Sequence, residues 1–547
     1  METSDNERSF ILQEDWLKNI RTTAGTEQWV VVFSNRNSDR ESVILYCAFI
    51  PNDYVERSLQ NPRWDLQLGY GRPGTIVYNR DGELSEKYFR YGNDDGIEPL
   101  VIWRNFYELK PDCREITEEF RLFFNLYFDS RENRYVRIDE SSGDEEDVVR
   151  VEGDTIKIRL STLKEYLSSR GMHLALYFSV QRYSQLTLDE LGLGVIRDQI
   201  VENKTTYQLF VGPSEPPIVK KRQTYSSLYG KKLVGAPEKV RIQNDLDDEK
   251  PKEYENFIIG IDDEGNPVTF TCNPEVLADF FGKNPGNPNF VTPVFFKKEV
   301  LSKYYSQPGK YSVEDGQLNC GSLWTLRLDN NHPRYVIVFL GDLGQTLGEK
   351  EQQYWGSFNV PPDGAISEVS HKRGVMAEFA DPTEKHLLFK QEFKEFQRRW
   401  ESAFGWCFFL PLSNDDSHFF AALRIPLTGD QAEFDAQILA LAKILVDSLN
   451  EEELSRNASR EAQGSISILE AFFDARGVAN WKSHIDFLRD LQALRSSGSA
   501  HRKGSRYKKV AAVWGIGQRD LREICTAIFG SAIQLIHFLN DALLCHE

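Results

Sequence analysis

The stretch QRDLREICTAIFGSAIQLIHFLNDALL, residues 518–544, repeats apolar residues at intervals of three, four and seven positions. These residues are Leu521, Ile524, Ile528, Leu535, Leu539 and Ala542. Such spacing places them on one face of an α-helix, so the stretch predicts one long amphipathic helix. Because an apolar helix face must be buried against other elements, it also predicts a helical bundle around this helix.

Three earlier segments show the same periodicity. They are QAEFDAQILALAKILVDSLNEEEL (431–454), SISILEAFFDARG (465–477) and WKSHIDFLRDLQALR (481–495). Gly477 follows the second segment as a helix stop signal. Together the segments predict a helical domain over residues 431–547, with four or five helices arranged as an antiparallel bundle.

A basic stretch, LRSSGSAHRKGSRYKK (494–509), interrupts this region. The whole chain has a net charge of −18, yet residues 431–547 contain 14 Lys and Arg against 15 Asp and Glu. No acidic residue lies between Asp490 and Asp520. A basic strip without acidic residues, with Tyr507 and Trp514 nearby, is typical of a surface that meets phosphate. A solvated basic helix end is the alternative interpretation.

The basic stretch also brings an arginine and a histidine together. Arg495 is predicted at the end of a helix, and the segment SSGSA then breaks the chain before His501. Gly498 gives backbone freedom, and the small residues allow a close approach to another helix. We therefore expect Arg495 and His501 to meet near the mouth of a groove between helices. A lone histidine is more often structural than catalytic. The pairing of His501 with Arg495 is therefore the reason to interpret His501 as a functional residue.

RSSGSAH, with five residues between Arg495 and His501, resembles the R-x(4–6)-H motif of the HEPN superfamily of small helical-bundle domains. The predicted helix order around the motif also resembles that family, over residues 431–547 only. GSAHRKG in particular is similar to bacterial HEPN proteins of the antiphage, abortive-infection type. The resemblance implies a metal-independent endoribonuclease without a cofactor, in which two bundles pair as a homodimer or higher oligomer and form one composite cleft.

The resemblance implies a role for each residue of the motif. His501 would transfer protons near neutral pH, and Arg495 would orient and stabilise the scissile phosphate. Ser496 takes the place of the Asn, Asp or His that often follows the arginine, and its hydroxyl would support catalysis. Lys503 stands where some members carry a modified tyrosine, which disfavours the toxin–antitoxin variant. The residues expected to hold the RNA backbone are Arg502, Lys503, Arg506, Lys508 and Lys509.

The rest of the chain predicts a multidomain α+β protein. Residues 1–215 contain short apolar runs typical of strands, with one clear helix at 161–171, and would sense or regulate. Residues 216–254 are polar and charged, which predicts a linker. Residues 255–430 predict a second β-rich or α+β domain. It would include a hairpin at 257–272, an amphipathic helix at 391–405 and a closing strand at 419–428.

Composition excludes several classes of protein. Seven scattered cysteines without a CxxC pattern predict neither a disulfide framework nor a cysteine metal site. The polar segment METSDNERSF does not predict a secretion signal, and no apolar run is long enough to predict a membrane span. A cytoplasmic protein without a bound metal is the simplest expectation.

Three classes of function remain open from the sequence. The first is a HEPN ribonuclease of antiphage defence that cleaves RNA, with transfer RNA as the family-level expectation, after its N-terminal regions bind a phage-derived trigger. The second is a non-catalytic module that binds RNA, a nucleotide or a protein in a defence or toxin–antitoxin system. The third is a structural dimer in which Arg495 and His501 form a hydrogen bond that caps the bundle.

Overall fold

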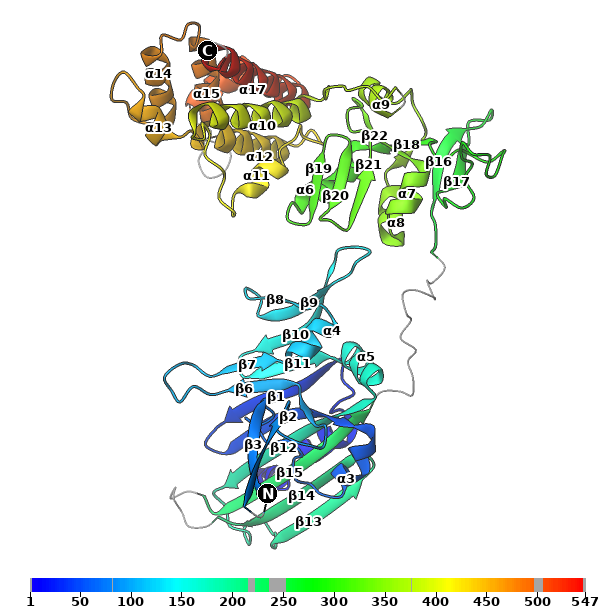
Figure 1. Cartoon of the computed structure of the whole chain (residues 1–547), viewed down its shortest axis with the longest axis vertical. Coiled ribbons are helices and arrows are strands. Elements are labelled where there is room, and N and C mark those ends of the chain that lie inside the picture. The colour runs from blue at the N-terminus through cyan, green and yellow to red at the C-terminus, as the bar shows by residue number, and fades with distance from the viewer. Residues whose placement is uncertain are drawn as a thin grey trace. The chain divides into compact units, whose positions relative to one another are not determined.

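The computed structural model describes residues 2–80, 82–214, 222–235, 252–374, 376–495 and 505–544. The chain divides into two compact units. Unit 1 comprises residues 1–139 and 144–250, and unit 2 comprises residues 140–143 and 251–547 (Figure 1). A β-rich first half followed by C-terminal helices confirms the predicted mixed architecture.

Unit 1 is built on one large antiparallel sheet, in the order β13-β14-β15-β12-β2-β1-β11-β10-β9-β8, with β5 paired to β2. Its strands are β1 (Trp29–Asn37), β2 (Glu41–Pro51), β5 (Glu98–Pro99), β8 (Tyr127–Asp129), β9 (Arg134–Ile138), β10 (Glu145–Glu152), β11 (Thr155–Arg159), β12 (Met172–Ser184), β13 (Ile196–Glu202), β14 (Thr205–Pro213) and β15 (Thr224–Gly235). Two hairpins lie outside this sheet, β3 (Gly74–Arg80) with β4 (Glu83–Phe89) and β6 (Val101–Arg104) with β7 (Cys113–Ile116).

The predicted linker over 216–254 is wrong for its central part. Residues 224–235 form β15, which pairs along its full length with β12, from Thr224 opposite Ser184 to Gly235 opposite His173. β15 also pairs with β14, so it is an inner strand of the sheet. Residues 215–221 and 236–251 lie outside the described residues.

Short helices pack on this sheet. They are α1 (Glu2–Ile11), α2 (Glu14–Thr22), α3 (Val55–Leu59), α4 (Glu118–Phe123) and α5 (Leu160–Arg170). α5 was predicted, and Gly171 ends it in the left-handed conformation, with φ of 60°. α1 and α2 were not predicted, because their apolar residues are few. Ile11 and Ile20 are nevertheless buried in a core with Phe178 of β12.

Unit 2 begins with a mixed α/β part. The predicted hairpin is confirmed as β16 (Asn256–Ile261) and β17 (Pro267–Thr271). One small sheet joins β22 (Tyr335–Phe339), β18 (Pro293–Lys297) and β23 (Asn359–Val360), and another joins β19 (Tyr311–Glu314), β20 (Gln317–Cys320) and β21 (Trp324–Arg327). The helices of this part are α6 (Ser302–Ser306), α7 (Leu340–Thr346), α8 (Glu349–Gly356) and α9 (Glu368–Gly374). Its core is centred on the fully buried Trp355, whose Nε1 donates to the Tyr304 hydroxyl at 2.7 Å.

The remainder of unit 2 is helical. Its elements are α10 (Lys385–Phe404), α11 (Ser417–Ala421), α12 (Gln431–Ala442), a π-helical turn η3 (Lys443–Asp447), α13 (Glu451–Arg456), α14 (Ser465–Ala475), α15 (Lys482–Arg495), α16 (Ser505–Trp514) and α17 (Leu521–Leu543). One hydrophobic core runs from Phe389 of α10 to Leu543 of α17. By packing, therefore, α10 belongs to this helical part, although the sequence placed it in the region 255–430.

The predicted strand at 419–428 is also wrong. Phe419 and Phe420 lie in the short helix α11, and both are partly buried against the helical core. The Phe420 ring lies 5.6 Å from that of Phe393 on α10. The apolar run was therefore a packing surface for helices, which short runs do not distinguish from a strand.

α17 is the helix, in the described part of the chain, that is long and apolar enough to cross a membrane. In its most apolar window, 56 % of the residues are buried inside the protein. Ile528, Ile536 and Leu539 are each at most 1 % exposed. The burial is typical of the core helix of a soluble protein.

Candidate functional site

α15 carries Arg495 to the edge of the helical core. Ile485, Leu488 and Leu491 of this helix are buried, each at most 1 % exposed. Arg495 is the last described residue of α15, and 27 % of its side chain is exposed. The helix thus anchors the backbone of Arg495 in the core while its guanidinium meets solvent.

The guanidinium of Arg495 forms an ion pair with Asp447. Its Nη1 donates to both carboxylate oxygens of Asp447, whose side chain is 43 % exposed. Among the described residues, the Nε and Nη2 atoms of Arg495 have no hydrogen-bond partner. A partly exposed pair of this kind contributes at most about 1 kcal/mol to stability. The pair therefore orients the guanidinium of a side chain that is 27 % exposed.

Asp447 ends the π-helical turn η3, which the sequence did not predict. The backbone N–H of Ser448 donates to the Lys443 carbonyl at 3.0 Å, five residues earlier, and the Ser448 hydroxyl donates to the same oxygen at 2.8 Å. Such turns are rare and occur frequently at functional sites. The one signal in the sequence was Asp447 itself, an acidic residue directly after the apolar run ILV (444–446).

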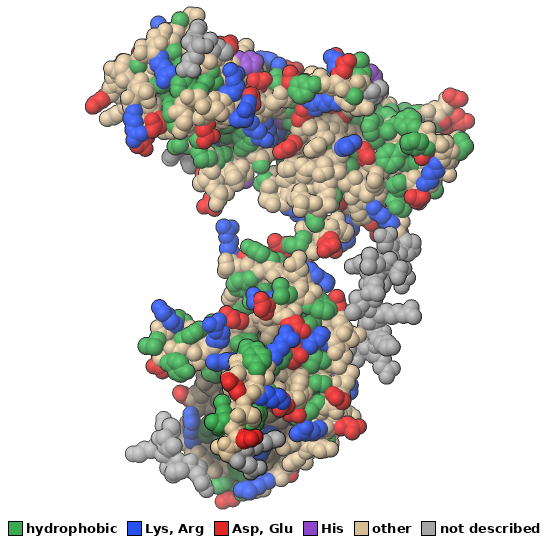
Figure 2. Space-filling view, in the orientation of Figure 1, with side chains coloured by type: hydrophobic (Ala, Val, Ile, Leu, Met, Phe, Trp, Pro, Cys, Tyr) green, Lys and Arg blue, Asp and Glu red, His purple; other side chains and the backbone are tan. Residues whose placement is uncertain are grey.

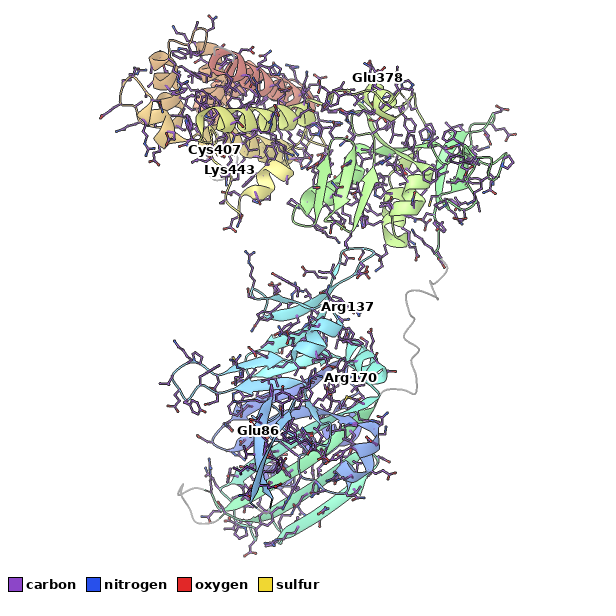
Figure 3. All side chains as sticks on the ribbon, viewed as in Figure 1. Glu86, Arg137, Arg170, Glu378, Cys407 and Lys443 are labelled. Carbon is purple, nitrogen blue, oxygen red and sulfur yellow. The ribbon has the colours of Figure 1, made fainter. Side chains whose placement is uncertain are left out.

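Lys443, at the start of η3, lies in a second charged contact. Its Nζ is 2.6 Å from a carboxylate oxygen of Asp416 and 4.2 Å from the centre of the Phe419 ring. The ion pair lowers the pKa of Asp416. Figure 3 shows Lys443 and Cys407 on this helical part of unit 2. η3 therefore presents a paired cation at one end and, at the other, the carboxylate that holds Arg495.

α16 presents two of the predicted RNA-binding residues to solvent. Lys508 and Lys509 are exposed, whereas Tyr507, Val510 and Ala511 of the same helix are buried. Tyr507, the aromatic residue within the basic stretch, is only 7 % exposed and does not lie on the surface with the lysines. Its ring belongs to the core, as helical spacing with Val510 and Ala511 explains.

Several predicted site residues cannot be placed beside Arg495. Ser496, His501, Arg502 and Lys503 lie outside the described residues. Arg506 lies in α16, and its side chain is not among those described. The described residues therefore bring together Arg495 and Asp447. α16, which carries Lys508 and Lys509, packs against α15.

Charge alone does not mark this site on the surface. Acidic and basic side chains are interspersed over the visible face of both units (Figure 2). Among the described residues, no group of three or more His, Cys, Asp or Glu side chains is arranged to hold a metal ion. Arg495, Asp447 and the two lysines of α16 are the described residues of the predicted site that could serve phosphate chemistry. Comparison with protein-family models, curated proteins and solved structures finds no match to this chain.

Proposed function

We propose that the C-terminal helices form a HEPN-like ribonuclease domain in which Arg495 and His501 are the catalytic pair. The observation that supports this most is the position of Arg495. Its backbone is fixed by a buried helix, its guanidinium is oriented by Asp447, and 27 % of its side chain is exposed. A preorganised cation of this kind suits a reaction in which negative charge grows on a phosphate.

The reaction is attack of the RNA 2′-OH on the adjacent phosphate. His501 takes the proton of the 2′-OH as the new O–P bond forms, and the imidazolium then gives a proton to the 5′-oxygen as the bond between phosphorus and that oxygen breaks. Arg495 stabilises the charge on the non-bridging oxygens. The products are a 2′,3′-cyclic phosphate and a 5′-OH end, and no metal ion takes part.

Further parts of the proposal concern binding and assembly. Ser496 supports the arginine, and Arg502, Lys503, Arg506, Lys508 and Lys509 hold the flanking RNA backbone without reading its sequence. Two copies of the domain pair to complete one cleft. The N-terminal region binds a phage-derived trigger, and the protein acts in the cytoplasm on RNA, with transfer RNA as a substrate class.

A cellular experiment tests the activity. Cells expressing the full chain are compared with cells expressing His501→Ala, and RNA ends that carry a 5′-OH are sequenced. We expect such ends to accumulate, and growth to stop, only with the unsubstituted chain. Because the phage-derived trigger is part of the proposal, the comparison is repeated during phage infection. Equal accumulation with His501→Ala would remove His501 from the mechanism.

The ion pair between Arg495 and Asp447 supports a second candidate function. A cation that already has an acidic partner can serve to join η3 to α15 without touching a substrate. In that case the helices form a non-catalytic module that binds RNA or a protein. RNA binding by the purified chain without any cleavage would favour this candidate.

A further inference from the structure

A cavity of about 660 Å³, open to solvent, lies in unit 2 between its α/β part and the first turns of α10 and α17. This volume is within the range of small-molecule sites, which span roughly 300 to 1,000 Å³. Apolar side chains of Leu301, Tyr305, Val336 and Ile425 form part of its wall. The guanidinium of Arg424 lies 4.6 Å from the centre of the Tyr305 ring. These two planar groups form a flat part of the wall. The cavity is therefore large enough and partly apolar enough for a nucleoside.

The polar part of the wall is strongly basic. Its basic residues are Lys298, Lys385, Arg424, Arg519 and Arg522, and its acidic residues are Glu384 and Glu523. Glu384 is paired with Lys298 at 2.7 Å, and Glu523 lies 3.7 Å from Arg519. Among the described residues, Lys385 and Arg522 form no ion pair. In a chain with a net charge of −18, a cavity with surplus cations favours an anionic ligand.

Two long helices begin at this cavity. Phe389 of α10 contacts Phe529 of α17, with ring centres 5.8 Å apart, and Arg399 Nη1 donates to Asn540 Oδ1 at 3.1 Å further along. Residue numbers rise together along the contact, so the helices run parallel and their N-termini lie at the same end (Figure 1). Each N-terminus carries a partial positive charge, and both therefore favour an anion.

The two helix starts differ in their capping. Asp520 accepts hydrogen bonds from the backbone N–H groups of Arg522 and Glu523, which caps α17. Glu384, at the start of α10, makes no such side-chain hydrogen bond. The first N–H groups of a helix have no acceptor within the helix. Asn331 Oδ1 accepts from the N–H groups of Thr383 and Glu384, and the Leu387 N–H donates to the Glu384 carbonyl. The donors that the start of α10 offers a ligand are therefore the N–H groups of Lys385 and His386, the first two residues of the helix.

His386 gives an independent sign of a ligand. It lines the cavity from the first turn of α10 and is only 8 % exposed. Its Nδ1 is buried and has no hydrogen-bond partner among the described residues, and the same holds for Nε of Arg424. Burial, together with the charges of Lys390, Lys298 and Arg424, holds the pKa of His386 well below its usual value. Buried polar atoms without partners are rare, and a bound ligand is one way to satisfy them.

We propose that this cavity binds a nucleotide, with its phosphates on Lys385, Arg522 and the start of α10 and its nucleoside against Tyr305. A sugar hydroxyl or a phosphate oxygen reaches His386. The site is independent of the proposed ribonuclease site, because it uses neither Arg495 nor His501. It would remain if the chain cleaved no RNA.

Isothermal titration calorimetry of the full chain tests the proposal, with ADP, adenosine and inorganic pyrophosphate as probes. We expect ADP to bind, adenosine to bind at least about tenfold more weakly, and pyrophosphate to displace ADP. Lys385→Ala and Arg522→Ala should each weaken ADP binding about tenfold or more, as expected for loss of a charged hydrogen bond. Both side chains lie at helix starts outside the hydrophobic core, so these variants are expected to fold.

Arg398→Ala is the matched control. It removes one positive charge from α10 at an exposed position where Arg398 pairs with Glu395, and Arg398 is not among the residues that line the cavity. We expect it to bind ADP as the unsubstituted chain does. Absence of ADP binding, equal binding of adenosine, no displacement by pyrophosphate, unchanged binding in Lys385→Ala and Arg522→Ala, or an equal loss in Arg398→Ala would each overturn the proposal.

Discussion

Asp447 is the residue that decides how Arg495 can act. Its carboxylate holds Nη1 of the guanidinium, and it adds a negative charge beside the proposed phosphate position. Asp447→Asn should therefore lower kcat for RNA cleavage roughly tenfold, because the guanidinium loses its orientation, while KM stays equal or falls. Asp447→Glu should recover part of the loss. An unchanged kcat in Asp447→Asn would show that the pair has no role in the reaction.

Lys390 provides a prediction about pH. Burial lowers its pKa from 10.5 to about 7, and its Nζ donates to the Ala421 carbonyl at 3.0 Å. The Lys390 amino group binds its proton more tightly in the unfolded chain than in the folded chain. Lys390 therefore lowers the free energy of unfolding most below pH 7, and this destabilisation disappears as the pH rises toward 10.5. Lys390→Met should therefore raise the free energy of unfolding by a few kcal/mol near pH 7, with a smaller gain at pH 10.

The measurement is chemical denaturation of both chains at several pH values. Lys394→Met on the same helix serves as the control, since the Lys394 side chain is 62 % exposed. A gain in the free energy of unfolding that does not depend on pH, or an equal gain in the control, would show that the buried Lys390 amino group does not destabilise the fold.

At the scale of elements, α16 is expected to act as an RNA-binding helix. Lys508 and Lys509 are exposed on it, and each contact with a phosphate releases counterions. Replacing both with Ala should weaken RNA binding. It should also reduce the magnitude of the slope of log K against log salt by about 1.4, because each contact with a single-stranded phosphate contributes about 0.7 to that slope. Lys482→Ala with Lys394→Ala removes the same charge from exposed positions elsewhere. An equal change in that control pair would mean that α16 is not the binding surface.

Element types followed from the sequence where apolar periodicity was long. α14, α15 and α17 lie where their repeats predicted them. Apolar residues that recur at helical spacing over several turns are compatible with a helix and not with a strand. α11 was mistaken for a strand, since the short run around Phe419 and Phe420 carries no period. The break at η3 depends on a hydrogen bond from Ser448, which no spacing rule predicts. The position of Arg495 was thus predictable, whereas its partner Asp447 was not.

At the scale of the whole molecule, the sheet of unit 1 extends further along the chain than the sequence predicted. β15 contains Lys231, a charged residue of the kind that favours a linker prediction. Its side chain is nevertheless only 1 % exposed, and its Nζ lies 2.8 Å from a carboxylate oxygen of Asp65. Tyr177 and Ser58 also donate to that carboxylate. A buried charge is tolerated when it is paired and hydrogen-bonded. Composition does not reveal such a partner 166 residues away along the chain.

The two units have separate hydrophobic cores and are expected to unfold separately. Leu174 is fully buried in unit 1, and Leu491 is 1 % exposed in unit 2. Each substitution to Ala should cost roughly 2 to 5 kcal/mol. In calorimetry of the full chain, Leu174→Ala should lower the melting temperature of one transition by several degrees, and Leu491→Ala that of the other. A single transition that both variants shift equally would contradict independent units.

The central claim is that Arg495 and His501 cleave RNA. The most direct measurement is the single-turnover cleavage rate of purified full-length protein on total transfer RNA in EDTA, with and without the trigger-containing phage lysate, and with mapping of both RNA ends. We expect 2′,3′-cyclic phosphate and 5′-OH ends, and a rate that falls about a hundredfold or more in Arg495→Ala and in His501→Ala while RNA binding persists. Cleavage by either variant at the unsubstituted rate, or ends of any other chemistry, would contradict the claim.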